Sequence, residues 1–116
     1  MLKRAQAGVA MIVSTTNEVA GHRIVQHLGL CRGITVRSRS VVGNFFGGLQ
    51  SVFGGKLGVY VRLAEDAREE AYQHMIEHAQ RAGANAVLGM RYDANEIMDG
   101  ITEVLAYGTA VVLQPL

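Results

Sequence analysis

The sequence has no tryptophan, one cysteine and one proline, and almost no excess of charge of either sign. Eleven Lys and Arg oppose ten Asp and Glu, so the chain offers no strong field to attract nucleic acid or an anionic membrane. Cys31 cannot form an internal disulfide, which fits a reducing compartment. The apolar run from Val9 to Val13 is too short for a signal-peptide core or a membrane span. These absences predict a cytoplasmic protein with no nucleic-acid partner and no membrane partner.

The 116 residues that are present suffice for one hydrophobic core. Hydrophobic residues make up 49% of the chain, and 14 glycines indicate tight turns and close backbone approaches. Residues 1–8 show no strand or helix pattern, so we expect a flexible N-terminal extension there. We expect a single domain over residues 9–116.

Hydrophobic periodicity divides this domain into a series of elements. Ile34 and Val36 alternate with Thr35 and Arg37, which indicates a strand with one buried face, and Gly29 and Gly33 suggest bends or bulges in it. The full set of expected elements is a strand at 9–14, an extended ribbon at 22–38, a short helix at 41–53, a long helix at 58–82, a strand at 85–92, a polar connection at 93–100 and a strand at 101–113.

The stretch from Gly83 to Asp93 is where the helical period changes to an apolar strand. Gly83 is a natural C-cap for the long helix, whose predicted apolar stripe is rich in alanine and therefore packs closely. That stripe is Tyr60, Leu63, Ala64, Ala67, Ala71, Met75, Ala79 and Ala82. The order of elements predicts an α+β fold of two layers, with one short and one long helix on one face of a largely antiparallel sheet.

Five short motifs resemble the YbjQ family, also called UPF0145 or DUF74, over about residues 11 to 113. They are Leu28-Gly29 with Gly33, the turn from Gly54-Gly55 to Tyr60, Ala67-Arg68 with Ala71, Gly83 to Val87, and Tyr107 to Val111. The resemblance implies a dodecin-like subunit of a homo-oligomeric ring, a pentamer or a decamer of two paired rings. The family carries a heavy-metal-binding label. Cys31 departs from the small aliphatic residue usual at its position, and there is no second cysteine to complete a soft metal site.

The sharpest chemical motif runs from His74 to His78 and has the form H-x-x-E-H. In zinc hydrolases with this inverted motif, two histidines one helical turn apart hold the metal and the glutamate acts as general base. His74 and His78 are therefore candidate ligands for a divalent metal ion, and Glu77 is the candidate base of the alternative function, a metal-dependent hydrolase. No third ligand is obvious in the sequence. Two histidines on a helix edge are more often partly exposed polar residues than ligands.

Other candidates are weaker. Cys31 could bind a soft metal, but a lone cysteine in a strand usually behaves as a small buried hydrophobe. His22 and His27 are five residues apart, so a regular strand would place them on opposite sides unless a bulge intervenes. The carboxylates Asp93, Glu96, Asp99 and Glu103 form the hard-metal alternative to a solvated loop.

Nucleotide binding by a recognised loop is excluded, because Gly55-Lys56 is followed by Leu57 and Gln50 stands where a Walker A motif needs its first glycine. The face with Phe45, Phe46 and Phe53 has almost no basic residues beside it, which favours burial in the core or at a subunit contact over membrane attachment. A ligand held between subunits is not excluded. We therefore expect a non-enzymatic binding or structural assembly module for a metal ion or a small ligand, with no catalytic residues, with a divalent metal ion as its candidate cofactor and with itself as partner.

Overall fold

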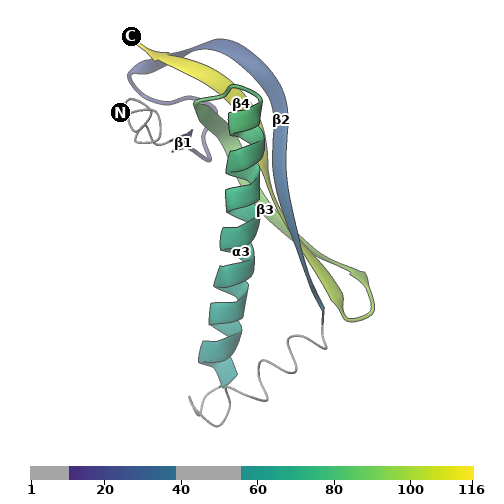
Figure 1. Cartoon of the computed structure of the whole chain (residues 1–116). Coiled ribbons are helices and arrows are strands. Elements are labelled where there is room, and N and C mark those ends of the chain that lie inside the picture. The colour runs from purple at the N-terminus through teal and green to yellow at the C-terminus, as the bar shows by residue number, and fades with distance from the viewer. Residues whose placement is uncertain (1–10, 39–55) are drawn as a thin grey trace, which may run out of the picture.

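A four-stranded sheet carries one long helix across one of its faces (Figure 1). The computed structural model describes residues 11–38 and 56–116, so the N-terminal extension and the Phe-bearing helix expected at 41–53 lie outside the described residues. The elements are β1 (Ile12–Val13), β2 (His22–Ser38), α3 (Lys56–Arg81), β3 (Ala86–Met98) and β4 (Ile101–Pro115). Within the described residues, no helix has the length and apolar character required to span a bilayer.

The strand order is β1-β3-β4-β2, with β1 parallel to β3 and the other two pairings antiparallel. The sheet is therefore mixed, and the predicted α+β class is confirmed. The predicted polar connection at 93–100 is wrong, because β3 continues to Met98 and only Asp99 and Gly100 form the turn to β4. Every side chain from Arg91 to Asp99 is exposed, so this half of β3 lacks the alternation of buried and exposed residues by which a sequence indicates a strand.

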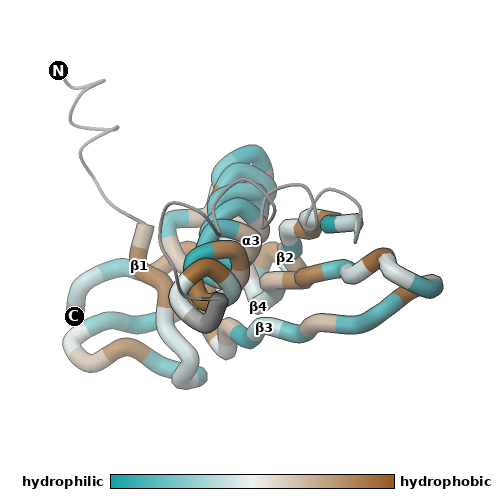
Figure 2. The backbone as a smooth tube through the Cα atoms, turned by 90° about the horizontal axis from the view of Figure 1, so that it is seen from below, coloured by the Kyte–Doolittle hydropathy of each residue, from teal (hydrophilic) through white to brown (hydrophobic). Residues whose placement is uncertain are grey.

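Helix α3 lies close to the sheet because three of the four side chains in its contact stripe are alanine. Ala67, Ala71, Met75 and Ala79 are buried at steps of four, and Figure 2 shows hydrophilic residues along the side of α3 that is turned away from the sheet. The predicted stripe extends too far at both ends. Tyr60, Ala64 and Ala82 are exposed, whereas Val59 is buried.

Gly33 sets how closely the helix approaches β2. A Cβ atom placed on Gly33 would lie 2.1 Å from the carbonyl oxygen of Ala71 and 2.3 Å from the amide nitrogen of Met75. Any other residue at this position would therefore collide with the helix backbone. Gly33 was expected to mark a bend or bulge, but its role is this contact.

The corner between α3 and β3 is closed by backbone hydrogen bonds. Gly83 has φ +94° and donates to the carbonyl of Gln80, while Ala84 donates to that of Ala79. This is the Schellman pattern predicted by Gly83. The side chain of Asn85 then pairs with both backbone groups of Leu113: Nδ2 donates to the carbonyl at 3.0 Å, and Oδ1 accepts from the amide at 2.8 Å.

Strand β2 buries the side opposite to its apolar one. Cys31, Gly33 and Thr35 lie under α3, whereas Leu30, Ile34 and Val36 retain 61%, 39% and 50% of their exposure. The predicted alternation of Ile34 and Val36 with Thr35 and Arg37 is present in β2, but in the single chain its apolar side remains accessible. We call this surface, on the side of the sheet remote from α3, the open face. By the strand register it comprises Leu30, Arg32, Ile34 and Val36 of β2, Glu103, Leu105 and Tyr107 of β4, and Arg91, Asp93 and Asn95 of β3.

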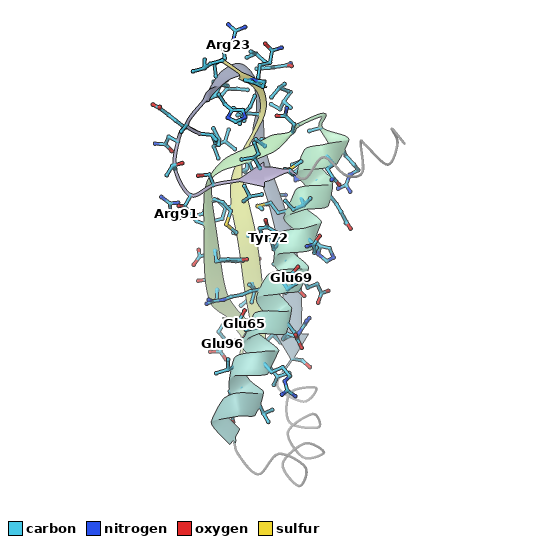
Figure 3. The ribbon with its side chains drawn as sticks, turned by 90° about the vertical axis from the view of Figure 1, so that its left-hand side faces the viewer. Arg23, Glu65, Glu69, Tyr72, Arg91 and Glu96 are labelled. Carbon is cyan, nitrogen blue, oxygen red and sulfur yellow. The ribbon has the colours of Figure 1, made fainter. Side chains whose placement is uncertain are left out.

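Toward the C-terminal end of β4, next to the open face, the same side of the sheet is covered by a small second core. Leu88, Val111 and Leu113 are buried there against Val19 and Ile24. Arg91, labelled in Figure 3, fixes the chain segment that precedes β2, because its guanidinium donates to the carbonyl of Thr15 at 2.9 Å. This covering ends where the open face begins.

Candidate functional site

His74 and His78 lie where α3 passes the outer edge of β2. His74 Nδ1 is 3.1 Å from the carbonyl oxygen of Ile34, and His78 Nδ1 is 3.0 Å from the amide nitrogen of Arg32. Four residues of helix rise about 6.0 Å and two residues of strand about 6.6 Å, so the two spacings match. The histidine pair therefore occupies backbone groups that an edge strand otherwise leaves unpaired.

These hydrogen bonds assign different tautomers to the two rings. His74 donates from Nδ1 to a carbonyl, which leaves the lone pair on Nε2 available. His78 accepts at Nδ1 from the Arg32 amide, so its neutral ring carries the proton on Nε2, and the Arg32 carbonyl 3.3 Å away receives no bond in that state. A metal ligand usually donates its second ring nitrogen to a carbonyl, which describes His74 and not His78.

No third ligand completes a site with this pair: within residues 11–38 and 56–116, no three His, Cys, Asp or Glu side chains are grouped so as to hold a metal ion. Glu77 is exposed on the same helix. His74 and His78 as metal ligands remain a prediction, one that requires His78 to turn away from Arg32.

Cys31 lies beneath α3 and is 1% exposed. Its thiol donates to the carbonyl of Gly108 at 3.5 Å, and burial raises the pKa of the thiol above its ordinary value. The Cys31 side chain fills space between the helix and the sheet. Its surroundings are those of a structural cysteine and disfavour the thiolate that a soft metal needs.

The strand register divides the acidic cluster between the two faces of the sheet. Asp93 and Glu103 lie on the side remote from α3, and Glu96 pairs with Thr102 on the other side. Asp93 Oδ1 accepts from the Ala94 amide, and Glu96 Oε2 accepts from the Gly100 amide, both at 3.0 Å. Asp93 and Glu96 thus each accept from a backbone amide of the hairpin, and they lie on opposite faces of the sheet, so they do not share a metal site.

Two bulges in β2 change the relation between His22 and His27. The register shifts at Val25 and at Leu28, so that His22 and His27 both face the side remote from α3. His27 lines a cavity of about 230 Å³ with Asn17 and Thr109, and His22 lines a neighbouring cavity of about 260 Å³. The bulges thus place the two histidines in adjacent hollows, which the spacing of five alone could not establish.

A further cavity, of about 280 Å³, lies between the first half of α3 and the hairpin of β3 and β4. Tyr60, Leu63 and Val104 line it, with Arg37 and Arg68 among its polar residues. The Arg68 guanidinium lies 5.6 Å from the ring centre of Tyr92. Burial, followed by the charge of Glu69, raises the pKa of Tyr92; Figure 3 shows Glu65, Glu69 and Tyr72 along this part of the helix.

Comparison with known proteins identifies the group to which the chain is related. Residues 11–114 match the model of the YbjQ family, whose description is "Putative heavy-metal-binding". The chain belongs to this family. A UPF0145 protein of Chromobacterium violaceum is 62% identical over 107 residues, covering 92% of each chain, and UPF0145 proteins of Burkholderia mallei and Burkholderia pseudomallei are 53% identical over 100 residues, covering 86% of this chain and 90% of theirs.

A solved structure of the DUF74 family, from Pediococcus pentosaceus, shares the fold with a TM-score of 0.59. It is 14% identical and is described as a protein of unknown function, and the match covers 90% of this chain and 98% of that one. The predicted family is therefore confirmed, and so is the fold. The relatives carry no enzymatic name.

Sequence reasoning missed the surface that the structure exposes most clearly, the open face. The signal was present in the alternation of Leu30, Ile34 and Val36. The alternation at Ile34 and Val36 predicts a buried apolar side, because the sequence of β2 does not show which side the helix covers. Gly33 is the sequence feature that could have indicated the covered side, since a glycine within a strand also marks a place where another backbone approaches closely.

Proposed function

We propose that this protein is a non-enzymatic subunit of a cytoplasmic homo-oligomer, a binding or structural assembly module whose ring form, pentameric or decameric, is suggested by the family. The observation that carries the proposal is the reversed burial of β2. The subunit buries Cys31, Gly33 and Thr35 while Leu30, Ile34 and Val36 stay accessible. Apolar side chains left accessible on one face in this way favour a contact with another molecule.

The energetic gain from covering this patch is substantial. Fully burying an aliphatic side chain is worth about 1.5–3 kcal/mol, so covering three half-exposed ones contributes about 3 kcal/mol. Leu105 and Tyr107, which are partly exposed on β4, enlarge the same patch. Association through it would give the strand the buried apolar side that its sequence encodes.

Light scattering coupled to size-exclusion chromatography tests the proposal. The subunit mass is 12.5 kDa. The purified chain should have a molar mass that is an integral multiple, greater than one, of this value at protein concentrations from about 10 to 200 μM, and native mass spectrometry should give the subunit number. Five or ten subunits would support the ring. Elution at 12.5 kDa throughout this range would contradict the proposal.

A second candidate function, binding of a divalent metal, is favoured by the hydrogen bond from His74 Nδ1 to Ile34, which orients Nε2 as a ligand. Zinc titration by calorimetry should show weak binding that His74→Ala removes and the matched control His22→Ala preserves. Equal zinc affinity in wild type and in a His74→Ala, His78→Ala double variant would exclude this site. The hydrolase alternative needs a third ligand beside His74 and His78, and the described residues supply none.

A further inference from the structure

The open face has a charge pattern that is ordered along the strands. The register of β2, β4 and β3 gives three successive rows across the sheet: Arg32, Tyr107 and Arg91; then Ile34, Leu105 and Asp93; then Val36, Glu103 and Asn95. The first row is basic, the middle row is apolar over two strands, and the third row carries a carboxylate at its centre. Positive and negative charge thus lie on opposite sides of an apolar middle row.

We propose that two copies of this chain stack through their open faces about a two-fold axis that lies between the sheets and runs along the Leu105 row, perpendicular to the strands. This interface rests on the proposed homo-oligomer and assigns one of its contacts. Rotation about such an axis reverses the strand direction while keeping β4 over β4. Glu103 of each copy then lies opposite Tyr107 of the other, between Arg32 and Arg91.

The pairing is self-complementary, as a two-fold interface must be. Stacked sheets are separated by about 10 Å, a gap that arginine and glutamate side chains can bridge from opposite sides. The middle rows, with Ile34 and Leu105, pack on each other. Asp93 lies at the rim and faces Asp93 of the second copy, which is the one unfavourable contact in the arrangement.

The sheet edges are less suited to association than this face. His74 and His78 occupy backbone groups of Ile34 and Arg32 on the outer edge of β2. On β3, Asp93 Oδ1 accepts from the Ala94 amide. Side chains that take up edge groups discourage strand addition from another chain.

A charge-reversal experiment tests the interface. Arg32→Glu and Glu103→Arg each place like charges against each other in a self-pair, so each variant alone should have half the wild-type mass or less by light scattering. A one-to-one mixture should recover the wild-type mass, because in a mixed pair the reversed charge at position 103 lies against the reversed charge at position 32, and the unchanged Glu103 lies against the unchanged Arg32; only one contact with Arg91 stays unfavourable. Asp93→Asn, which keeps the acceptor for Ala94, should lower the dissociation constant measured by sedimentation equilibrium.

Cross-linking provides a readout that does not depend on changed charges. In a Cys31→Ala background, Leu105→Cys should be cross-linked between copies by a short bismaleimide, because the two positions face each other on the axis. Thr109→Cys is the matched control: it lies on the same strand and face, yet its copies would be about 26 Å apart, eight residues of strand rise.

The outcomes separate the two proposals. A 12.5 kDa wild-type protein would overturn the homo-oligomer itself. An oligomer with an odd number of subunits, such as a single pentamer, would overturn only this interface. So would an oligomer in which the Leu105→Cys subunits are not cross-linked, or in which the charge-reversed variants keep the wild-type mass or fail to recover it on mixing.

Discussion

Replacing Gly33 by alanine should destabilise the protein more than any other glycine-to-alanine change in β2 or α3. The added Cβ would lie 2.1 Å from Ala71 O, 2.3 Å from Met75 N and 2.7 Å from His74 Cβ. Two of these atoms belong to the helix backbone, so no side-chain rotation can relieve the contact, and α3 must move outward by about 1.5 Å to reach normal van der Waals separation.

The cost follows from this displacement. Overpacking typically costs about 1–3 kcal/mol, and each weakened hydrogen bond from His74 or His78 to β2 adds up to about 1 kcal/mol. We expect a loss of about 3 kcal/mol in the free energy of unfolding, or a fall of about 12 °C in Tm for a domain of this size.

Urea denaturation followed by circular dichroism at one fixed protein concentration measures the loss, because oligomerisation makes stability depend on concentration. Gly58→Ala is the matched control. Gly58 lies in α3 with nothing within 4 Å of its added Cβ, so alanine there should stabilise by about 0.5–1 kcal/mol. A Gly33→Ala protein within about 0.5 kcal/mol of wild type would refute the close-contact reasoning.

Three further predictions concern single side chains. Asn85→Ala should cost about 2–3 kcal/mol, since it removes both hydrogen bonds to the Leu113 backbone. Asn85→Asp keeps the acceptor for the Leu113 amide but places a carboxylate oxygen against the Leu113 carbonyl, so it should also be less stable than wild type; equal stability of all three proteins in urea would contradict the paired geometry. Cys31 should react with a disulfide reagent at pH 8 at least about 100-fold more slowly in the native protein than in denaturant, because burial raises its pKa, and equal rates would show that the thiol is accessible. The hydrogen bond from Arg37, at 2.6 Å, lowers the pKa of Glu70 below its ordinary value of 4.5, so this pair stabilises the fold above that pH and the contribution is lost as pH falls through the lowered pKa; an NMR titration should show the pKa rising in Arg37→Ala, and an unchanged value would exclude the pair in solution.

The parts of the fold that local chemistry determines were predictable from the sequence. Gly83 ends α3 as expected, and Ala67, Ala71, Met75 and Ala79 form the contact stripe that their spacing indicated. A helix cap and a helical period depend on residues within one or two turns, so a single sequence contains the necessary information.

The parts that failed depend on partners distant in the chain. The second half of β3 has exposed side chains on both faces, so no alternation of buried residues marks it in the sequence. It is a strand because it pairs with β4. The side of β2 that is buried is the one on which α3 approaches closely at Gly33.

The candidate site likewise has one part that local spacing predicted and another that depends on residues distant in the chain. Spacing alone identified His74 and His78 as neighbours on one helix face. Their hydrogen bonds to Arg32 and Ile34 span 46 and 40 positions of the sequence, so the sequence alone could not show them. The bulge at Val25, which turns His22 and His27 to the same side, likewise depends on pairing with β4.

The corner at Gly83 has a consequence for how this family can vary in length. Ala84 still bonds to the helix and Asn85 already bonds to Val111 of the sheet, so the chain has no slack between the two layers. One inserted residue after Gly83 would shift β3 by a single position and turn every side chain of that strand to the other face. Natural insertions and deletions should therefore be absent from 83–86 and collect at the exposed turn of Asp99 and Gly100, where added residues extend the hairpin without disturbing its register.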